Sequence, residues 1–318
     1  MKAKVLISAP CYEERCQEGM KVLKDNDCEL VINQHGRPYT FEEQKSLIGD
    51  IDGVIAGSDI WDANIFKYAK NLKCISRFGV GIENLNLDDM KQYQIKANYS
   101  PGINSNAVSE LAMALILALL RNVPSLVQST KSGGWTRYVT HELKSLTVGL
   151  MGFGAIAKHV AEKLIPFGAD IIAYDLYPNE EEARRLGVTM CTMDEIIEKS
   201  HIISIHIPCN GQTKGMFQKD LFSKMKDGVY IVNTARGPIV KENDIYEAIM
   251  SGKIAGYGTD VFETEPVDPN NPLFTLDNYI CTPHVAAETY ENYTEMGLHT
   301  AKSVVQMLRG ETPKYLLV

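Results

Sequence analysis

Short apolar segments alternate with amphipathic segments along the whole chain of 318 residues. An uninterrupted apolar, β-branched run predicts a strand covered on both faces, as in a parallel sheet flanked by helices. Apolar residues spaced three and four apart predict the intervening helices. In the first third of the chain, the predicted strands are 5–8, 53–56 and 73–76, and the predicted helices are 13–24, 41–48 and 63–69.

A second series of the same kind fills the rest of the chain. Two such series predict two doubly wound α/β units rather than one very wide sheet. We therefore expect an α/β fold with two doubly wound parallel-sheet domains. The strands of the second series are expected at 146–151, 171–174, 202–207, 230–233, 255–260 and 279–282.

The boundary between the two series is expected near Ser100-Pro101-Gly102, where proline and glycine interrupt the pattern. A long helix from about 106 to 128, with Asn106 as its N-cap, would then connect the halves. This helix carries an apolar stripe that is most simply core packing, with a dimer contact as the alternative. The stripe consists of Leu111, Ala114, Leu115, Ala118 and Leu119.

A final helix over about 288–309 follows the last strand and could return to the first unit. We therefore expect one domain built from residues 1–103 plus 286–318. The second domain is expected to comprise residues 104–285.

Charge and composition exclude several classes of protein. The net charge of −8 argues against a nucleic-acid surface, which needs clustered Lys and Arg, but leaves an anionic small molecule open. The seven cysteines are scattered without a Cys-x-x-Cys pair or zinc spacing, so no metal is expected and a reducing compartment is favoured. The most apolar run, 111–120, falls far short of the roughly 20 residues that cross a bilayer. We expect a soluble, cytoplasmic protein with no membrane partner.

A glycine turn carries the most specific local signal. Gly152-x-Gly154-x-x-Ala157 follows a predicted strand and opens a predicted helix over 155–164. The first glycine permits the tight turn, the second lets the backbone approach a pyrophosphate, and a small third residue allows close packing. Asp175 ends the next strand, where an acid grips the adenosine ribose, and no arginine follows it directly. This pattern favours NAD over NADP; the alternative is an ordinary strand-to-helix turn.

Three later segments place reactive side chains directly after apolar strands. They contribute Arg236, Glu265 and His284, together with the carboxylate of Asp260. Oxidation of an alcohol next to a carboxylate needs a base for the hydroxyl proton and a fixed cation for the carboxylate. His titrates near neutrality, a carboxylate can orient it, and Arg binds carboxylates through two parallel hydrogen bonds.

Each of these residues has a structural alternative when taken alone. His284 could serve only to follow Pro283 in a loop, Arg236 could be a surface ion-pair partner, and Glu265 a solvated loop acid. Their joint occurrence at successive strand ends, where α/β proteins bind ligands, favours a catalytic set.

With these motifs in place, the chain resembles the D-isomer-specific 2-hydroxyacid dehydrogenase family over nearly its full length. In addition to the glycine turn, the resemblance rests on six segments. They are Phe78-Gly-Val-Gly-Ile-Glu-Asn-Leu-Asn-Leu87, Ser100-Pro-Gly-Ile-Asn104, Ser204-Ile-His-Ile-Pro208, Asn233-Thr-Ala-Arg-Gly237, Asp260-Val-Phe-Glu-Thr-Glu-Pro266 and Thr282-Pro-His284.

The resemblance implies an NAD-dependent oxidoreductase that transfers hydride between nicotinamide and C2 of a small D-2-hydroxy or 2-oxo acid. It also implies a flavodoxin-like substrate domain, a Rossmann NAD-binding domain and a homodimer. Arg236, Glu265 and His284 would be the catalytic set, and Val80, Gly81, Arg77 and Arg236 the substrate contacts. The candidate cofactor contacts are Gly152, Gly154, Ala155, Ile156, Asp175, His206, Pro208, Thr213, Thr234, Ala235, Arg236, Asp260 and His284.

Departures from the family pattern bear on the substrate. Phosphoglycerate dehydrogenases usually carry Arg-Ser-x-Thr where this chain has Gly57-Ser58-Asp59-Ile60. Arg77 or Arg137 could replace the missing arginine. The expected substrate is therefore 3-phosphoglycerate, or one of the hydroxypyruvate and glyoxylate type. The alternative function is an NAD-binding regulatory protein, similar to the corepressors that share this fold.

Overall fold

The computed structural model describes residues 2–318, which divide into two compact units. Unit 1 comprises residues up to 104 together with 288–318, and unit 2 comprises residues 105–287. Every paired strand runs parallel to its neighbours. The predicted fold class, two doubly wound parallel-sheet units, is confirmed.

Unit 1 is built on a five-stranded sheet in the order β2-β1-β3-β4-β5, which is the flavodoxin-like order. Its strands are β1 Lys4–Ile7, β2 Glu29–Ile32, β3 Gly53–Ala56, β4 Cys74–Arg77 and β5 Lys96–Asn98. Its helices are α1 Tyr12–Arg15, α2 Gln17–Asp25, α3 Phe41–Leu47, α4 Ala63–Phe66, α5 Leu87–Gln92 and α13 Tyr290–Leu308.

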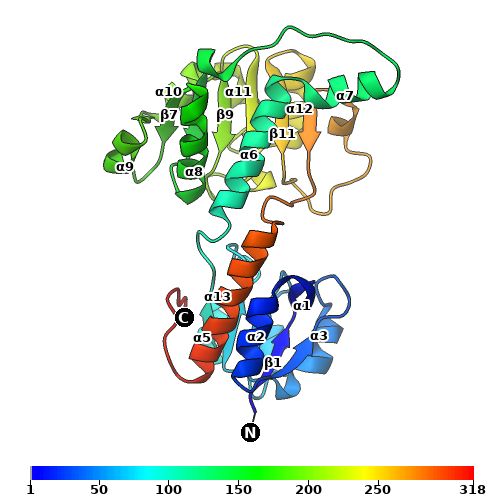
Figure 1. Cartoon of the computed structure of the whole chain (residues 1–318), viewed down its shortest axis with the longest axis vertical. Helices are drawn as coiled ribbons and strands as arrows, with labels where there is room; N and C mark the ends of the chain where they lie inside the picture. The colour runs from blue at the N-terminus through cyan, green and yellow to red at the C-terminus, as the bar shows by residue number, and fades with distance from the viewer. Residues whose placement is uncertain (1) are drawn as a thin grey trace. The chain divides into compact units, whose positions relative to one another are not determined.

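The final helix belongs to unit 1, as Figure 1 shows in red beside the blue α2. α13 packs on α2, β3 and β4, and its buried Val304 lies in one cluster with Val5 and Ile7 of β1. The hydroxyl of Tyr12 donates a 2.7 Å hydrogen bond to the Gly297 carbonyl, which satisfies a polar group inside this contact. The carboxyl-terminal segment therefore completes the core that the amino-terminal strands begin.

Unit 2 is built on a seven-stranded sheet in the order β12-β11-β10-β9-β6-β7-β8. Its strands are β6 Thr147–Met151, β7 Asp170–Tyr174, β8 Thr189–Met190, β9 Ile202–Ile205, β10 Val229–Asn233, β11 Ile254–Thr259 and β12 Tyr279–Cys281. Its helices are α6 Ser105–Leu120, α7 Val123–Lys131, α8 Ala155–Leu164, α9 Glu180–Arg185, α10 Met193–Lys199, α11 Lys219–Lys224 and α12 Glu242–Met250.

The strand order reverses beside β6, because β7 continues the sheet on one side and β9 on the other. Val148 and Leu150 of β6 are fully buried, which explains the uninterrupted apolar run in the sequence. Ligands of such sheets bind at the carboxyl ends of the strands at this switch point. The fold therefore directs attention to the loop that follows β6.

The prediction of one long helix over about 106–128 with Asn106 as its N-cap is wrong in two respects. The chain forms α6 and α7 instead, because Asn122 between them adopts the left-handed region with φ of 50°. Asn106 is not the N-cap; it lies inside the first turn of α6, where its side chain bonds with Glu110 and Lys163. Within residues 2–318 no single helix is long and apolar enough to span a bilayer. α6 and α7 taken together would be, but the two helices are bent by 63° relative to each other.

The predicted apolar stripe of α6 is only partly buried. Leu115 and Leu119 lie in the core of unit 2, whereas Leu111 and Ala118 are half-buried and Ala114 is exposed. Three strands, β2, β5 and β8, have no counterpart in the prediction. The helix expected at 13–24 is interrupted at Cys16, which separates α1 from α2.

Candidate active site

The glycine turn joins β6 to α8 in the geometry that a dinucleotide site requires. Gly152 has φ of +95°, a conformation strained for any side chain, and a Cβ there would lie 2.9 Å from the His206 backbone. At Gly154, by contrast, a Cβ would meet nothing within 4 Å, so the turn is open on that side. α8 begins at Ala155 and continues through Ile156, so its unpaired N–H groups lie directly after this opening.

Asp175 stands at the end of β7, beside the turn. One carboxylate oxygen accepts the Phe153 N–H at 2.7 Å, and the other accepts the Tyr177 N–H at 2.8 Å. The carboxylate therefore fixes the glycine turn and its own loop, and each oxygen retains a lone pair for a ribose hydroxyl.

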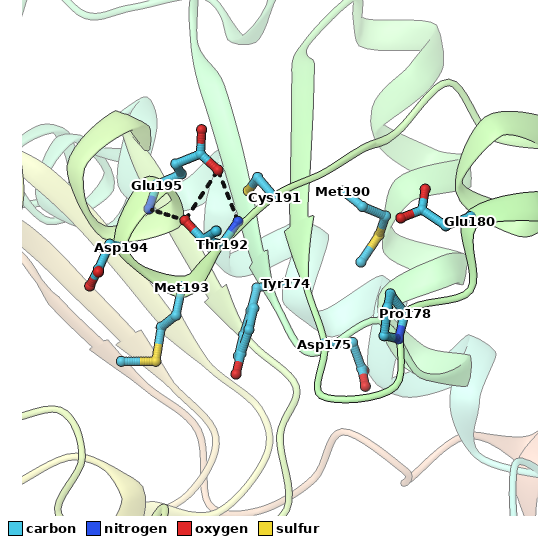
Figure 2. A pocket seen from close by; sticks show the side chains of 10 residues that line it. All are labelled: Tyr174, Asp175, Pro178, Glu180, Met190, Cys191, Thr192, Met193, Asp194 and Glu195. Carbon is cyan, nitrogen blue, oxygen red and sulfur yellow. Dashed lines mark hydrogen bonds between the residues drawn. The ribbon is translucent and has the colours of Figure 1, made fainter.

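A cavity of about 570 Å³ adjoins Asp175, and Figure 2 shows the side chains that line it. Four of them are carboxylates and, among the described lining residues, none is Lys, Arg or His; the four are Asp175, Glu180, Asp194 and Glu195. A ribose 2′-phosphate would meet like charge here, so the lining favours NAD over NADP.

On the opposite side of the switch point, β9 and β10 present polar atoms toward the same edge. The Thr234 hydroxyl after β10 is buried and has no hydrogen-bond partner among residues 2–318. Nε2 of His206 and the Ser204 hydroxyl share a hydrogen bond of 2.8 Å, in which either group can be the donor. The other ring nitrogen, Nδ1, is buried and has no partner in the described chain. Burial lowers the pKa of His206 to about 4, so the ring is neutral.

These orphaned atoms fit a bound dinucleotide. β10 lies two strand spacings, roughly 10 Å, from β6 on one side, and β7 lies next to β6 on the other, so Thr234 and Asp175 stand on opposite sides of the glycine turn. Pro208 and Thr213 close the loop after β9, because the Thr213 hydroxyl donates to the Pro208 carbonyl at 2.6 Å. The Ala235 N–H donates to the Asn233 side chain at 3.0 Å, which shapes the loop after β10.

Two loops that meet by close backbone packing carry Arg236 and Glu265. A Cβ at Gly237 would lie 1.8 Å from the Phe262 carbonyl oxygen, so only glycine allows the loops after β10 and β11 to touch. The side chain of Asn233 donates to the Arg236 carbonyl at 3.0 Å and closes the turn that presents the guanidinium.

Glu265 and His284 form a hydrogen bond of 2.8 Å between a carboxylate oxygen and ring nitrogen Nδ1. Their side chains are 38% and 52% exposed, so the pair is held in place yet reachable by a ligand. The other Glu265 oxygen accepts the Phe262 N–H at 3.0 Å, which fixes the carboxylate in its orientation. The arrangement matches an imidazole base oriented by an acid.

The hydrogen bond between Glu265 and His284 shifts the two pKa values in opposite directions. The hydrogen bond to Glu265 raises the pKa of His284 above its usual value, with burial and the Arg236 charge opposing it. Burial alone would raise the pKa of Glu265, but the bonds to His284 and the Phe262 N–H lower it overall. Glu265 is thus the anion that favours protonated His284.

Asp260 holds the loop that carries His284. It is 1% exposed and accepts hydrogen bonds from the Thr282 hydroxyl at 2.6 Å and from the N–H groups of Val285 and Ala286 at 2.9 and 2.8 Å. These bonds hold a loop in which His284 has φ of +56°, a conformation that non-glycine residues rarely adopt. Asp260 therefore positions His284.

In unit 1 the loop after β4 offers backbone groups. The N–H groups of Val80 and Gly81 are half-buried and meet no acceptor within residues 2–318. Arg77 holds this loop, since its guanidinium donates to the carbonyls of Phe78, Ala56 and Gly81, the last two at 3.3 and 3.0 Å. A direct contact between Arg77 and a substrate stays a prediction.

Some residues that shape the site were not singled out from the sequence. Asn84 accepts from Arg77 at 3.1 Å and donates to the carbonyls of Gly57 and Asp59 at 3.0 and 2.6 Å, so it ties two loops of unit 1 together. In unit 2 the Thr282 hydroxyl joins the loops after β12 and β11 by donating to Asp260, and the Asn233 side chain closes the loop after β10 on itself. All three lie inside motifs quoted above, and that placement is the signal that pointed to them.

Comparison with known proteins gives consistent similarities. The sequence profile described as D-isomer specific 2-hydroxyacid dehydrogenase, NAD binding domain, matches residues 113–286. Hydroxypyruvate reductase of Thermotoga maritima is 36% identical over 88% of this chain and 94% of its own length. D-3-phosphoglycerate dehydrogenase of Archaeoglobus fulgidus is 36% identical over 96% of this chain, which spans only 58% of that protein.

Solved structures agree in fold. The TT0316 protein of Thermus thermophilus superimposes with a TM-score of 0.92 at 26% identity, covering 99% of this chain and 100% of that one. D-lactate dehydrogenase of Lactobacillus jensenii, solved with NAD+, gives 0.83 at 25% identity and covers 99% of both chains.

Proposed function

Because the chain belongs to the D-isomer-specific 2-hydroxyacid dehydrogenase family, we propose that it transfers hydride between NAD and C2 of a small 2-hydroxy acid. The family, the NAD cofactor and the oxidoreductase class are confirmed by the comparisons. The observation that carries the proposed reaction is the 2.8 Å bond between Glu265 and His284, on loops that also present Arg236.

His284 acts as the acid–base group in this proposal. When bound, NAD supplies the hydride acceptor for oxidation, and NADH supplies the hydride donor for reduction. In oxidation, Nε2 of His284 takes the C2 hydroxyl proton as the C2–H bond breaks and the carbonyl forms. In reduction, protonated His284 returns that proton to the developing alkoxide. Glu265 orients the ring through Nδ1 and stabilises its charged form.

Recognition of the substrate carboxylate is assigned to Arg236 and to the N–H groups of Val80 and Gly81. The guanidinium already donates from Nη1 to the Ala235 carbonyl at 2.8 Å, which restrains its position. Two parallel N–H bonds suit a carboxylate, and they hold C2 in register for hydride transfer.

A panel of 2-oxo acids with NADH tests the proposal. We expect NADH oxidation with at least one of hydroxypyruvate, glyoxylate, pyruvate and 3-phosphohydroxypyruvate. Failure of all four while NADH binds would contradict an enzymatic role and favour the alternative, an NAD-responsive binding protein.

We further propose a homodimer. α7 has no buried residue, and the segment after it exposes Trp135, Tyr138 and Val139 at 85%, 51% and 104%. Large apolar side chains exposed within one short segment suit a surface that another chain covers. Light scattering should give twice the mass of 35.4 kDa at micromolar concentration, and a monomer under those conditions would contradict the proposal.

All seven cysteines lie in the described part of the chain as free thiols. Because thiols stay reduced in a reducing compartment, seven free cysteines support the cytoplasmic location that we propose.

A further inference from the structure

We infer that the carboxyl edge of the unit 1 sheet selects a 2-oxo or 2-hydroxy acid with one carboxylate and an uncharged C3 substituent, and disfavours its phosphorylated counterpart. The inference rests on the proposed function and narrows its substrate class. It is carried by the residues that follow β1, β3 and β4, where the substrate carboxylate is assigned.

The first observation is the crowding at Gly57, directly after β3. A Cβ at this position would lie 3.0 Å from the Cα of Ala9, 3.3 Å from Cδ of Pro10 and 3.3 Å from the Ser8 carbonyl oxygen. The Gly57 N–H also donates to the Ser8 hydroxyl at 3.0 Å, which ties the loops after β1 and β3 together. A long cationic side chain at residue 57 would therefore have to displace backbone.

The second observation is a buried carboxylate two residues later. Asp59 is 3% exposed; it accepts the Ser8 hydroxyl and, at 2.6 Å, the Tyr39 N–H. Burial raises the pKa of Asp59, and these hydrogen bonds oppose that rise. The loop that could approach a C3 substituent thus contributes negative rather than positive charge.

The third observation is that the guanidinium groups of this edge already serve the protein. Arg37 pairs with Glu43 at 2.7 Å, and Arg15 pairs with Glu288 at 2.9 Å. Arg77 donates to the carbonyls of its own loop. A phosphate would have to compete with these partners.

The balance of charge points the same way. Carboxylates outnumber these three guanidinium groups in the segments after the strands; the carboxylates are Glu13, Glu14, Asp59, Asp62 and Glu83. The substrate carboxylate has Arg236 and two backbone N–H groups as its assigned partners, whereas an additional dianionic phosphate in this field would be poorly compensated.

Steady-state assays compare kcat/KM for hydroxypyruvate and for 3-phosphohydroxypyruvate, with NADH held constant. We expect the unphosphorylated acid to be favoured by at least about 100-fold, the scale of discrimination against a poorly matched polar group. An equal or higher value for the phosphorylated acid would overturn the inference and leave the proposed function intact. Turnover of neither acid, nor of glyoxylate or pyruvate, would overturn both.

Ser58→Arg provides a gain-of-function arm, because Ser58 is exposed beside Gly57, and Ser58→Gln is its uncharged control. Relative to the glutamine variant, we expect the arginine variant to raise the phosphorylated-to-unphosphorylated kcat/KM ratio by about 10-fold or more. An unchanged ratio would contradict selection by charge at this edge. A phosphate preference of the wild-type protein that is lost in Arg137→Gln would assign a phosphate site to Arg137 and also overturn the inference.

Discussion

Both sheets are parallel and end in a carboxyl edge, but the two edges present different chemical groups. At the carboxyl edge of unit 2, the side chains of Glu265 and His284 are half-exposed and oriented by their neighbours. At the carboxyl edge of unit 1, Arg77 and Asn84 are engaged in holding loops, and the half-buried backbone of Val80 and Gly81 is left to donate. One edge is suited to proton transfer, and the other to recognition of an anion.

The difference follows from what each task requires. A group that moves protons must have a tunable pKa, which the backbone lacks, so unit 2 presents an imidazole beside a carboxylate. Binding of a fixed negative charge is served by N–H groups that are rigidly placed in advance. Substitutions of the proton-transfer pair and of the residue that positions it in unit 2 should therefore lower kcat, and substitutions that loosen the Val80–Gly81 loop in unit 1 should raise KM.

His284→Ala is expected to have the largest effect. Loss of the acid–base group should lower kcat by about 10²–10⁴-fold while NADH binding, followed by fluorescence titration, stays near that of the wild type. His159→Ala is the matched control, because His159 is a half-exposed histidine of α8 paired with Glu162. A near-normal kcat for His284→Ala would contradict the assignment.

Asp260→Asn is expected to cause the second-largest loss of kcat. The amide NH₂ would face one of the N–H groups or the hydroxyl that the carboxylate now accepts, at a cost of about 1–3 kcal/mol. We expect a kcat lower by about 10–100-fold, because His284 loses its fixed orientation. A loss of thermal stability with unchanged kcat per folded molecule would show that Asp260 is structural only.

Glu265→Gln should lower kcat by about 10-fold and move the pH profile. The Glu265 hydrogen bond raises the pKa of His284, so the wild-type protein keeps the imidazole protonated to higher pH. Reduction needs that protonated form and should decline as pH rises through the raised pKa; oxidation should increase over the same range. In the variant both limbs should shift to lower pH, and unmoved limbs would contradict the pairing.

Arg77→Lys is expected to have an effect no larger than that of Glu265→Gln, on KM rather than on kcat, and it sharpens the comparison. An ammonium cannot reproduce the fork that contacts the carbonyls of Ala56, Phe78 and Gly81 together. KM for the 2-oxo acid should rise about 10-fold, because the Val80–Gly81 loop is less ordered, with kcat and NADH affinity little changed. A fall in kcat alone would contradict the division of tasks.

The elements that could be predicted from the sequence have long or strongly patterned signals. β6 and the helix over 155–164 were predicted closely, because an apolar run, two glycines and a helical period occur together. β5 consists of Lys96-Ala97-Asn98, whose short and polar sequence carries no strand pattern. The break at Asn122 arises from a left-handed backbone conformation within an apolar stretch, which periodicity does not indicate.

In the candidate site, too, some residues can be predicted from a sequence pattern and others cannot. Arg236, Glu265 and His284 could be proposed because each follows a predicted strand, and strand ends converge in a parallel sheet. Asn84 acts by bonding the carbonyls of Gly57 and Asp59, some 25 residues away, and that role depends on tertiary contacts alone. Arg77 is expected as a substrate contact only from the family resemblance; its bonds to the carbonyls of Gly81 and Ala56 emerge only in the folded loop.

The most direct test of the two-edge account is a crystal structure of the protein with NADH and oxamate, an unreactive analogue of a 2-oxo acid. We predict that the oxamate carboxylate accepts the N–H groups of Val80 and Gly81 at about 2.7–3.2 Å, with Nε2 of His284 at a similar distance from the oxygen that represents the C2 carbonyl. A carboxylate held instead by a unit 1 side chain, with the imidazole directed away from the ligand, would contradict the account.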